Sequence, residues 1–143
     1  MDLGIGEKFQ KETKYNRNTM KGGFLDWATK PDIYKTYSGV KKIKLPEPKQ
    51  EKNMILDEIL QTRHSVRNFS EDPVNIQDLS YLLWSTTGIQ RIEHGYEFRT
   101  APSAGALYPI ETYLVINNVE DLEQGVYHYA IKNHKLEQLK AGD

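Results

Sequence analysis

The sequence predicts an α+β domain in which helices come first and strands follow. Three observations indicate this class. Two segments with helical spacing of apolar residues occur at 54–62 and 76–87. Segments of alternating or β-branched character come later, at 112–117, 126–131 and 135–139. Helices that precede the strands, rather than alternate with them, are typical of α+β domains.

Two helices are expected in the body of the chain. The first spans 54–62, with Asn53 placed to accept hydrogen bonds from its first turn as an N-cap. The second spans 76–87, with Asn75 as its N-cap and Gly88 as the residue that ends it. The apolar positions of the second helix form one stripe that needs a partner layer: Ile76, Leu79, Leu82 and Leu83.

The rest of the body is expected to be loop and strand. Residues 63–69 lack helical periodicity, and residues 89–102 are polar and are interpreted as a loop. Residues 112–117 are rich in β-branched side chains, which favours a strand. The last two strand segments, 126–131 and 135–139, are close enough along the chain to form a hairpin.

The first 52 residues differ from the body in charge. Residues 1–52 hold 12 Lys+Arg and 7 Asp+Glu, a net charge of +5, whereas residues 53–143 hold 7 and 13, a net charge of −6. Basic tails that bind nucleic acid are usually denser and unbroken. The sequence therefore favours a basic arm, with an extended linker at 41–48, that lies across an acidic body. Disordered tails are poor in aromatic residues, and because this arm contains several, we expect it to be pinned to a surface.

Composition excludes several classes of protein. The 143 residues carry a net charge of −1, which does not suit a protein that coats nucleic acid. No apolar run approaches the ~20 residues that span a bilayer. The first residues lack the basic and apolar regions of a secretory signal, so a cytoplasmic protein is expected. The chain has no cysteine and no histidines at metal-ligand spacing, which argues against disulfides and a metal site.

The segment Arg63-His64-Ser65-Val66-Arg67-Asn68-Phe69 has a pattern suited to an anion. Alternate side chains of an extended chain share one face, so Arg63, Ser65 and Arg67 are expected to project together. Arginine offers a fork of donors that matches phosphate oxygens, so this face suits a long anionic ligand. From the spacing alone, a solvated loop with ordinary surface ion pairs is the preferred interpretation.

A second segment, residues 100–109, combines tiny side chains with two prolines. Tiny residues let the backbone approach a flat ligand closely, and Ser103 is placed to cap a short helix. Close packing of a helix on the sheet at a tight turn is the alternative. The spacing does not separate these two interpretations.

Taken together, the two segments resemble a known family. Arg-His-Ser-Val-Arg-Asn-Phe at 63–69 resembles the N-terminal FMN signature of the nitroreductase superfamily. Ala-Pro-Ser-Ala-Gly-Ala-Leu-Tyr-Pro-Ile-Glu at 101–111 resembles the SagB-type dehydrogenase branch, which includes thiazole-forming peptide oxidases. Segments of the arm at 12–14, 25–27 and 35–37 are similar to the leading part of that branch. The implied fold has helices around a mainly antiparallel sheet, with 53–143 as the N-terminal part of the FMN-binding domain.

The resemblance implies a role for eight residues. Arg63 and Ser65 would bind the phosphate and ribityl end of FMN, with His64 beside them. Arg67 would lie by the N1–O2 edge of the flavin ring, where reduction places negative charge. The second segment would approach the flavin from the partner subunit, through Pro102, Ser103, Ala104 and Gly105.

The resemblance also implies a reaction and an assembly. Hydride would pass through flavin N5 in a ping-pong reaction, between NAD(P)H or a peptide azoline and an acceptor such as a nitro compound, quinone or oxygen. The family builds its sites at a homodimer interface. FMN is therefore expected between two copies, or between this chain and a separate chain that carries the C-terminal part of the family fold, which we expect to be missing from these 143 residues. A truncated, non-catalytic half that serves as a binding or assembly module is the alternative.

Overall fold

The computed structural model describes residues 4–18, 20, 22–23, 26–49 and 54–142, and the chain forms two compact units, Met1–Pro31 and Asp32–Asp143. The first unit contains the helix α1 (Ile5–Thr13) and the 3₁₀ turn η1 (Trp27–Thr29). The sequence does not predict this helix, because only Ile5 and Phe9 mark its apolar face. Both side chains are exposed, as is Tyr15, so Phe9 and Tyr15 are not buried within this unit.

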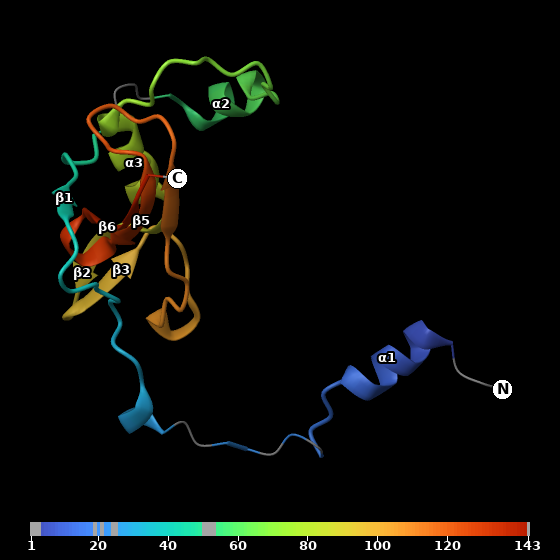
Figure 1. Ribbon diagram of the computed structural model, residues 1–143. Helices are drawn as coiled ribbons and strands as arrows, with labels where there is room; N and C mark the ends of the chain where they lie inside the picture. The colour runs from blue at the N-terminus through green and yellow to red at the C-terminus, as the bar shows by residue number, and fades with distance from the viewer. Residues whose placement is uncertain (1–3, 19, 21, 24–25, 50–53, 143) are drawn as a thin grey trace. The chain divides into compact units, whose positions relative to one another are not determined.

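The second unit is built on a four-stranded antiparallel sheet with strand order β1-β6-β5-β4 (Figure 1). A separate two-stranded ladder pairs β2 with β3. These strands, together with the helices, confirm the expected α+β class. The strands are β1 (Lys42–Lys44), β2 (Ile89–Glu93), β3 (Tyr96–Arg99), β4 (Tyr113–Ile116), β5 (Gly125–Ala130) and β6 (Lys135–Ala141).

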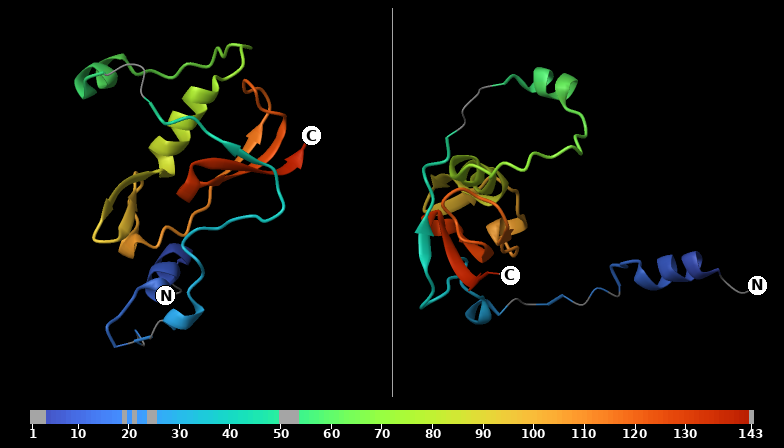
Figure 2. Two further views of the ribbon diagram at one scale, coloured as in Figure 1. Left: turned by 90° about the vertical axis from the view of Figure 1, so that its left-hand side faces the viewer. Right: turned by 45° about the horizontal axis from the view of Figure 1, so that its top comes forward.

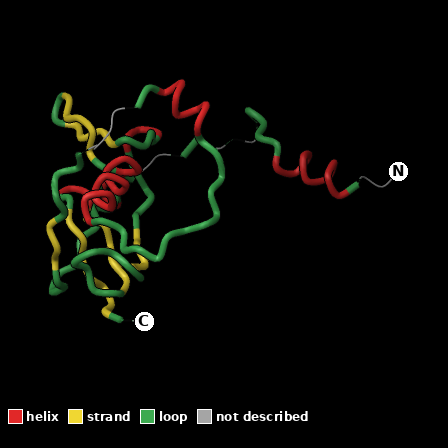
Figure 3. The backbone as a smooth tube through the Cα atoms, turned by 90° about the horizontal axis from the view of Figure 1, so that it is seen from above, coloured by secondary structure: helices red, strands yellow, loops and turns green. Residues whose placement is uncertain are grey.

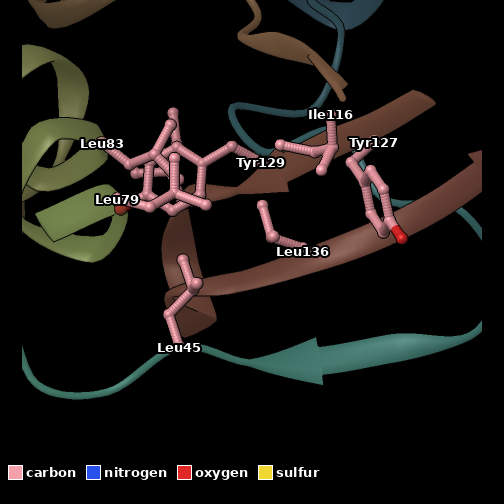
Figure 4. Close-up of a cluster of buried hydrophobic side chains, with 8 residues drawn as sticks. Leu45, Leu79, Leu83, Ile116, Tyr127, Tyr129 and Leu136 are labelled. Carbon is pink, nitrogen blue, oxygen red and sulfur yellow. The ribbon is translucent and has the colours of Figure 1, made fainter. Parts of the chain in front are cut away.

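The helix α3 (Ile76–Thr87) packs against the sheet, as Figures 3 and 4 show. Its bounds are those expected from the sequence, and the Asn75 side chain accepts a hydrogen bond from the Gln77 amide at 2.6 Å, which confirms the N-cap. The helix contributes Leu79 and Leu83 to the core, whereas the expected member Leu82 is 55% exposed. The buried core consists of Leu45, Leu79, Leu83, Ile116, Tyr127, Tyr129, Ile131 and Leu136.

The helix α2 (Leu56–Thr62) begins later than the sequence suggests, with Ile55 rather than Asn53 at its N-cap. Asn53, like Phe24 and Leu25 of the arm, lies outside the described residues. All residues of α2 are exposed, including the large apolar side chains of Leu56 and Leu60. No helix among the described segments has the length and apolar character needed to cross a bilayer.

The segment expected to be an extended linker is part of the sheet. Strand β1 pairs with β6 in the register Ile43↔Leu136, and Leu45 is buried in the core. Tyr34 and Tyr37 are half-buried against the same unit. The contacts therefore place the unit boundary before Asp32, earlier than the expected end of the arm at residue 52.

The interpretation of 89–102 as a loop is wrong, because this stretch contains the β2–β3 hairpin. His94 and Gly95 connect the strands with φ values of +50° and +82°. Two successive positive φ values match the twist of a two-residue hairpin turn. The expected hairpin of β5 and β6 is confirmed, with the 3₁₀ turn η3 (Ile131–Asn133) between its strands.

Gly88 ends α3 with an extended conformation rather than a left-handed one, at φ −65° and ψ 158°. A Cβ atom built on Gly88 would lie 2.7 Å from both Cα and the carbonyl oxygen of Trp84, inside van der Waals contact. We therefore expect Gly88→Ala to lower the free energy of unfolding by about 1–3 kcal/mol, the usual cost of overpacking. Urea unfolding measures this, with Gly22→Ala as the control because its Cβ would meet no atom within 4 Å. Equal stability of the two variants would contradict the packing argument.

Candidate functional site

The segment Arg63–Phe69 leaves α2 without helix or strand structure, as expected, and all seven residues are exposed. Arg63 is the C-cap residue of α2, and its backbone N–H donates to the Ile59 carbonyl at 2.8 Å. The guanidinium groups of Arg63 and Arg67 form no ion pair within the described ranges. The surface ion pairs of an ordinary solvated loop are therefore not formed here, and both cations remain available to an anion.

His64 and Ser65 lie in the same exposed segment. The His64 ring is held close to the helix end, with Nδ1 3.0 Å from the Thr62 carbonyl oxygen. Nδ1 is therefore occupied by this local contact, and Nε2 is the ring nitrogen left to contact a ligand. The segment thus offers two guanidinium groups, one hydroxyl and one imidazole, a donor set suited to phosphate oxygens.

The Pro102–Gly105 loop joins β3 to β4 and contains the 3₁₀ turn η2 (Ala104–Ala106). Ser103 precedes this turn, but its Oγ does not cap it and instead accepts a hydrogen bond from the Tyr108 amide at 2.9 Å. Gly105 has φ +63°, so it occupies the left-handed region that glycine adopts without steric cost. The tight turn expected at Gly105 is therefore present.

Tyr108 and Arg99 hold this loop, although sequence reasoning gave neither of them a site role. The Arg99 backbone N–H donates to the Tyr108 hydroxyl at 3.0 Å, and the Arg99 guanidinium carbon lies 4.5 Å from the centre of the Tyr108 ring. The backbone of Tyr108 has φ +44°, an uncommon conformation for a bulky residue. The sequence carries no signal for this role of Arg99, because the role depends on the position of Arg99 at the end of β3, in a stretch that the sequence predicts to be a polar loop.

An open pocket of about 570 Å³ lies beside this loop, between it and the β2–β3 hairpin. Its lining includes Pro102, Ser103 and Gly105 of the predicted site, together with Phe98, Arg99 and Tyr108. Its volume is in the range of small-molecule sites.

The two candidate segments do not meet within one copy of the chain. In Figure 1 the segment after α2 lies at the top and the one between β3 and β4 at the bottom, and the left-hand view of Figure 2 shows the same separation. The structure therefore gathers Pro102, Ser103, Ala104 and Gly105 in one loop and Arg63, His64, Ser65 and Arg67 in another exposed segment.

A buried polar network follows the loop, at the end of the second motif. His128 has no exposed surface, and its ring nitrogens lie 2.9 Å from Glu137 Oε2 and 3.1 Å from Glu111 Oε2. The backbone N–H of Tyr37 donates to Glu137 at 3.1 Å, and the Lys42 ammonium lies 3.3 Å from the same carboxylate. His128 and Glu137 face each other across β5 and β6, in register. This network ties the segment before β1 to the sheet.

Because of this network, we expect the free energy of unfolding to fall at acid pH. Burial raises the pKa of Glu137, but hydrogen bonds from His128, the Tyr37 amide and Lys42 outweigh burial and hold that pKa below its ordinary value of 4.5. A depressed carboxyl pKa stabilises the fold above about pH 4.5, and this contribution is lost as the pH falls through the lower folded-state value. We expect Glu137→Gln to cost about 1–3 kcal/mol at neutral pH and to flatten the acid limb of the stability curve.

Urea unfolding across the acid range checks this prediction. Glu120→Gln is the matched control, because Glu120 is an exposed carboxylate outside the network. Parallel pH dependence of the wild type and Glu137→Gln would show that another group governs the acid limb.

Comparison with known proteins identifies the family of the chain. Residues 60–143, more than half of the sequence and including both candidate segments, match the model of the Nitroreductase family. The chain belongs to the nitroreductase family. A relative from Methanocaldococcus jannaschii, provisionally named a nitroreductase, is 36% identical over 98 residues, 68% of this chain and 46% of that protein. The trifolitoxin-processing protein TfxB of Rhizobium leguminosarum bv. trifolii is 36% identical over 64 residues, 43% of this chain and 17% of that protein.

Two solved structures, both provisionally named nitroreductases, share the fold. The one from Anabaena variabilis superposes with a TM-score of 0.64 at 28% identity and covers 99% of this chain and 27% of that chain. The one from Ralstonia eutropha superposes with a TM-score of 0.58 at 34% identity and covers 76% and 48%. This nitroreductase-family chain thus spans about half, or less, of the length of the relatives it matches.

Proposed function

We propose that this nitroreductase-family chain binds FMN and takes part in hydride transfer through it. The observation that carries the proposal is the exposed segment 63–69, in which two arginines flank a serine and form no ion pair with the described residues. This donor set fits the chemistry of FMN, which carries a phosphate at one end and gains negative charge on its ring when reduced. Bound FMN would supply a ring that accepts and returns hydride at N5.

Each residue of the segment has a distinct part in this proposal. Arg63 and Ser65 bind the phosphate and ribityl end, because a guanidinium fork and a hydroxyl donate to phosphate oxygens. His64 lies beside them. Arg67 lies at the N1–O2 edge of the ring and stabilises the negative charge that reduction places there.

The Pro102–Gly105 loop completes the site from a second copy of the chain. Its separation from the segment after α2 supports this arrangement, as the left-hand view of Figure 2 shows. The exposed apolar side chains of α2, such as Leu56 at 66% and Leu60 at 65%, support a homodimer because apolar surface of this kind favours burial against a partner. Gly105 and Ala104 keep the loop small enough for its backbone to approach the flat ring.

The SagB-type branch is the finer part of the proposal. The loop sequence Ser103-Ala104-Gly105-Ala106 is less polar than the corresponding loop of many classical nitroreductases. The similarity to TfxB, which is named for processing trifolitoxin, also favours this branch. The electron donor is then a peptide azoline and the acceptor oxygen. NAD(P)H as donor, with a nitro compound or quinone as acceptor, is the corresponding reductive route.

Anaerobic half-reactions of the FMN-loaded protein test the function. Loss of the flavin absorption band on adding an azoline peptide or NAD(P)H, and its return on adding oxygen or a nitro compound, is the expected result. The donor that bleaches the flavin faster identifies the branch. A protein that remains colourless after incubation with FMN would contradict the proposal and leave the binding or assembly module as its role.

A further inference from the structure

Arg99 is buried at the end of β3, with 5% of its surface exposed. Its Nη2 donates to the Ile33 carbonyl at 3.2 Å, and its guanidinium carbon lies 4.5 Å and 5.1 Å from the ring centres of Tyr108 and Tyr34. Two further nitrogens, Nε and Nη1, are buried without a hydrogen-bond partner in the described part of the chain. The guanidinium therefore lies against two tyrosine side chains and one carbonyl, and two of its three nitrogens have no acceptor among the described residues.

Among the described residues, no carboxylate forms an ion pair with this buried guanidinium. Glu97, two residues away on the same strand, accepts a hydrogen bond from the Tyr34 hydroxyl at 2.5 Å instead. A buried cation without a counter-ion is costly, as is each buried donor without an acceptor. The fold therefore maintains an unfavourable arrangement that an entering anion would relieve.

The pocket beside the Pro102–Gly105 loop is where such an anion would enter, because Arg99 is among its lining residues. The lining also includes a second arginine, Arg91, and no acidic residue. Arg91 is already paired, with its Nε 3.1 Å from Glu93 and its guanidinium carbon 4.4 Å from the Phe98 ring centre. Of the two pocket cations, Arg99 is thus the one without an ion pair in the described part of the chain.

We infer that this pocket binds the oxyanion of a small organic molecule, a carboxylate or a phosphate, with Arg99 as the receiving cation. The Phe98 and Tyr108 rings supply the apolar contacts for the rest of the ligand. Nε and Nη1 are covered in this structure, so the anion displaces a covering side chain as it enters. Tyr108, which is half-buried and has the strained φ of +44°, is the side chain placed to move.

The inference deepens the proposed function and rests on it in one respect only, namely that the ligand is the substrate. Ser103 and Gly105 line the same pocket and belong to the loop that is proposed to face the flavin. An anionic group held by Arg99 would thus anchor a substrate next to the flavin-facing loop. Anion binding itself requires no flavin, so it can be measured separately.

Calorimetric titration of the full chain with 4-nitrobenzoate and with its neutral analogue 4-nitrobenzamide tests the inference. We expect the carboxylate to bind roughly tenfold or more tightly, as charge-assisted hydrogen bonds require. Arg99→Met should abolish that preference, Arg99→Lys should retain part of it, and Arg17→Met, which removes an exposed arginine in the other unit, should retain all of it. Circular dichroism establishes that each variant is folded.

Equal affinity for the two compounds in the wild type, or a carboxylate preference that survives in folded Arg99→Met, would overturn the inference. Repeating the titration with FMN-saturated protein distinguishes the two sources of the oxyanion. Unchanged affinity for 4-nitrobenzoate assigns the pocket to a substrate anion, whereas loss of binding in FMN but not in riboflavin assigns it to the flavin phosphate. Flavin absorbance separately reports whether FMN binds at all, so failure of the proposed function remains distinguishable.

Discussion

Arg67→Ala is expected to slow flavin reduction by about a hundredfold. Reduction places negative charge at the N1–O2 edge, and a fixed guanidinium there stabilises the developing charge by ~3 kcal/mol, with each 1.36 kcal/mol worth about a factor of ten. The same loss should lower the reduction potential of the bound flavin. FMN affinity should fall less, because Arg63 and Ser65 would still hold the phosphate. Stopped-flow reduction and a potentiometric titration measure the two effects.

Two variants make this result specific. Arg67→Lys should recover part of the potential, because it restores the charge without the planar fork. Arg17→Ala should change neither quantity, since Arg17 lies outside the family match at 60–143. An unchanged potential together with an unchanged reduction rate in Arg67→Ala would remove Arg67 from the flavin.

Arg63→Ala is expected to weaken FMN binding roughly tenfold to a hundredfold, the range for losing one charge-assisted hydrogen bond of ~1.5–3 kcal/mol. Riboflavin lacks the phosphate, so its affinity should change little. The exposed Arg63 side chain has no ion pair within the described ranges, so its removal leaves no uncompensated partner in the free protein. Fluorescence titration with both flavins measures the difference.

The comparison of FMN with riboflavin distinguishes the loss of a phosphate contact from a general disruption of the flavin site. Arg63 is also the C-cap residue of α2, so the helix content of the variant and the wild type must be compared by circular dichroism. Arg63→Lys should keep part of the preference for FMN over riboflavin. If riboflavin affinity falls as much as FMN affinity, Arg63 does not bind the phosphate.

The parts of the fold that were predictable are those with strong local signals. For α3, an N-capping asparagine, an apolar stripe and a terminal glycine together define both ends. The β5–β6 hairpin likewise follows from two strand-forming segments and a short connection. In both cases local preference and tertiary packing favour the same conformation.

Other elements depend on contacts distant in sequence. Strand β1 is short and contains charged residues on either side of Ile43, so only its pairing with β6 makes it a strand. The β2–β3 hairpin was missed because His94-Gly95 is a less obvious turn signal than Asn-Gly or Asp-Gly.

The candidate site also combines features that local sequence predicts with features that depend on contacts distant in sequence. The glycine turn of the Pro102–Gly105 loop was predictable, because few residues other than glycine adopt φ +63°. The support of this loop by Arg99 and Tyr108 was not, because their contact depends on the hairpin. Exposure of the segment 63–69 was expected of a loop, whereas its separation from the second motif required the three-dimensional arrangement (Figure 1).

The central claim is that FMN binds where segment 63–69 of one copy meets the Pro102–Gly105 loop of another. Sedimentation velocity of the FMN-loaded chain, recorded at the flavin and the peptide absorption bands, tests it most directly. The account predicts that the flavin sediments with a species of twice the chain mass of 16.6 kDa. Flavin that sediments with the 16.6 kDa species, or that stays free beside the protein, would contradict it.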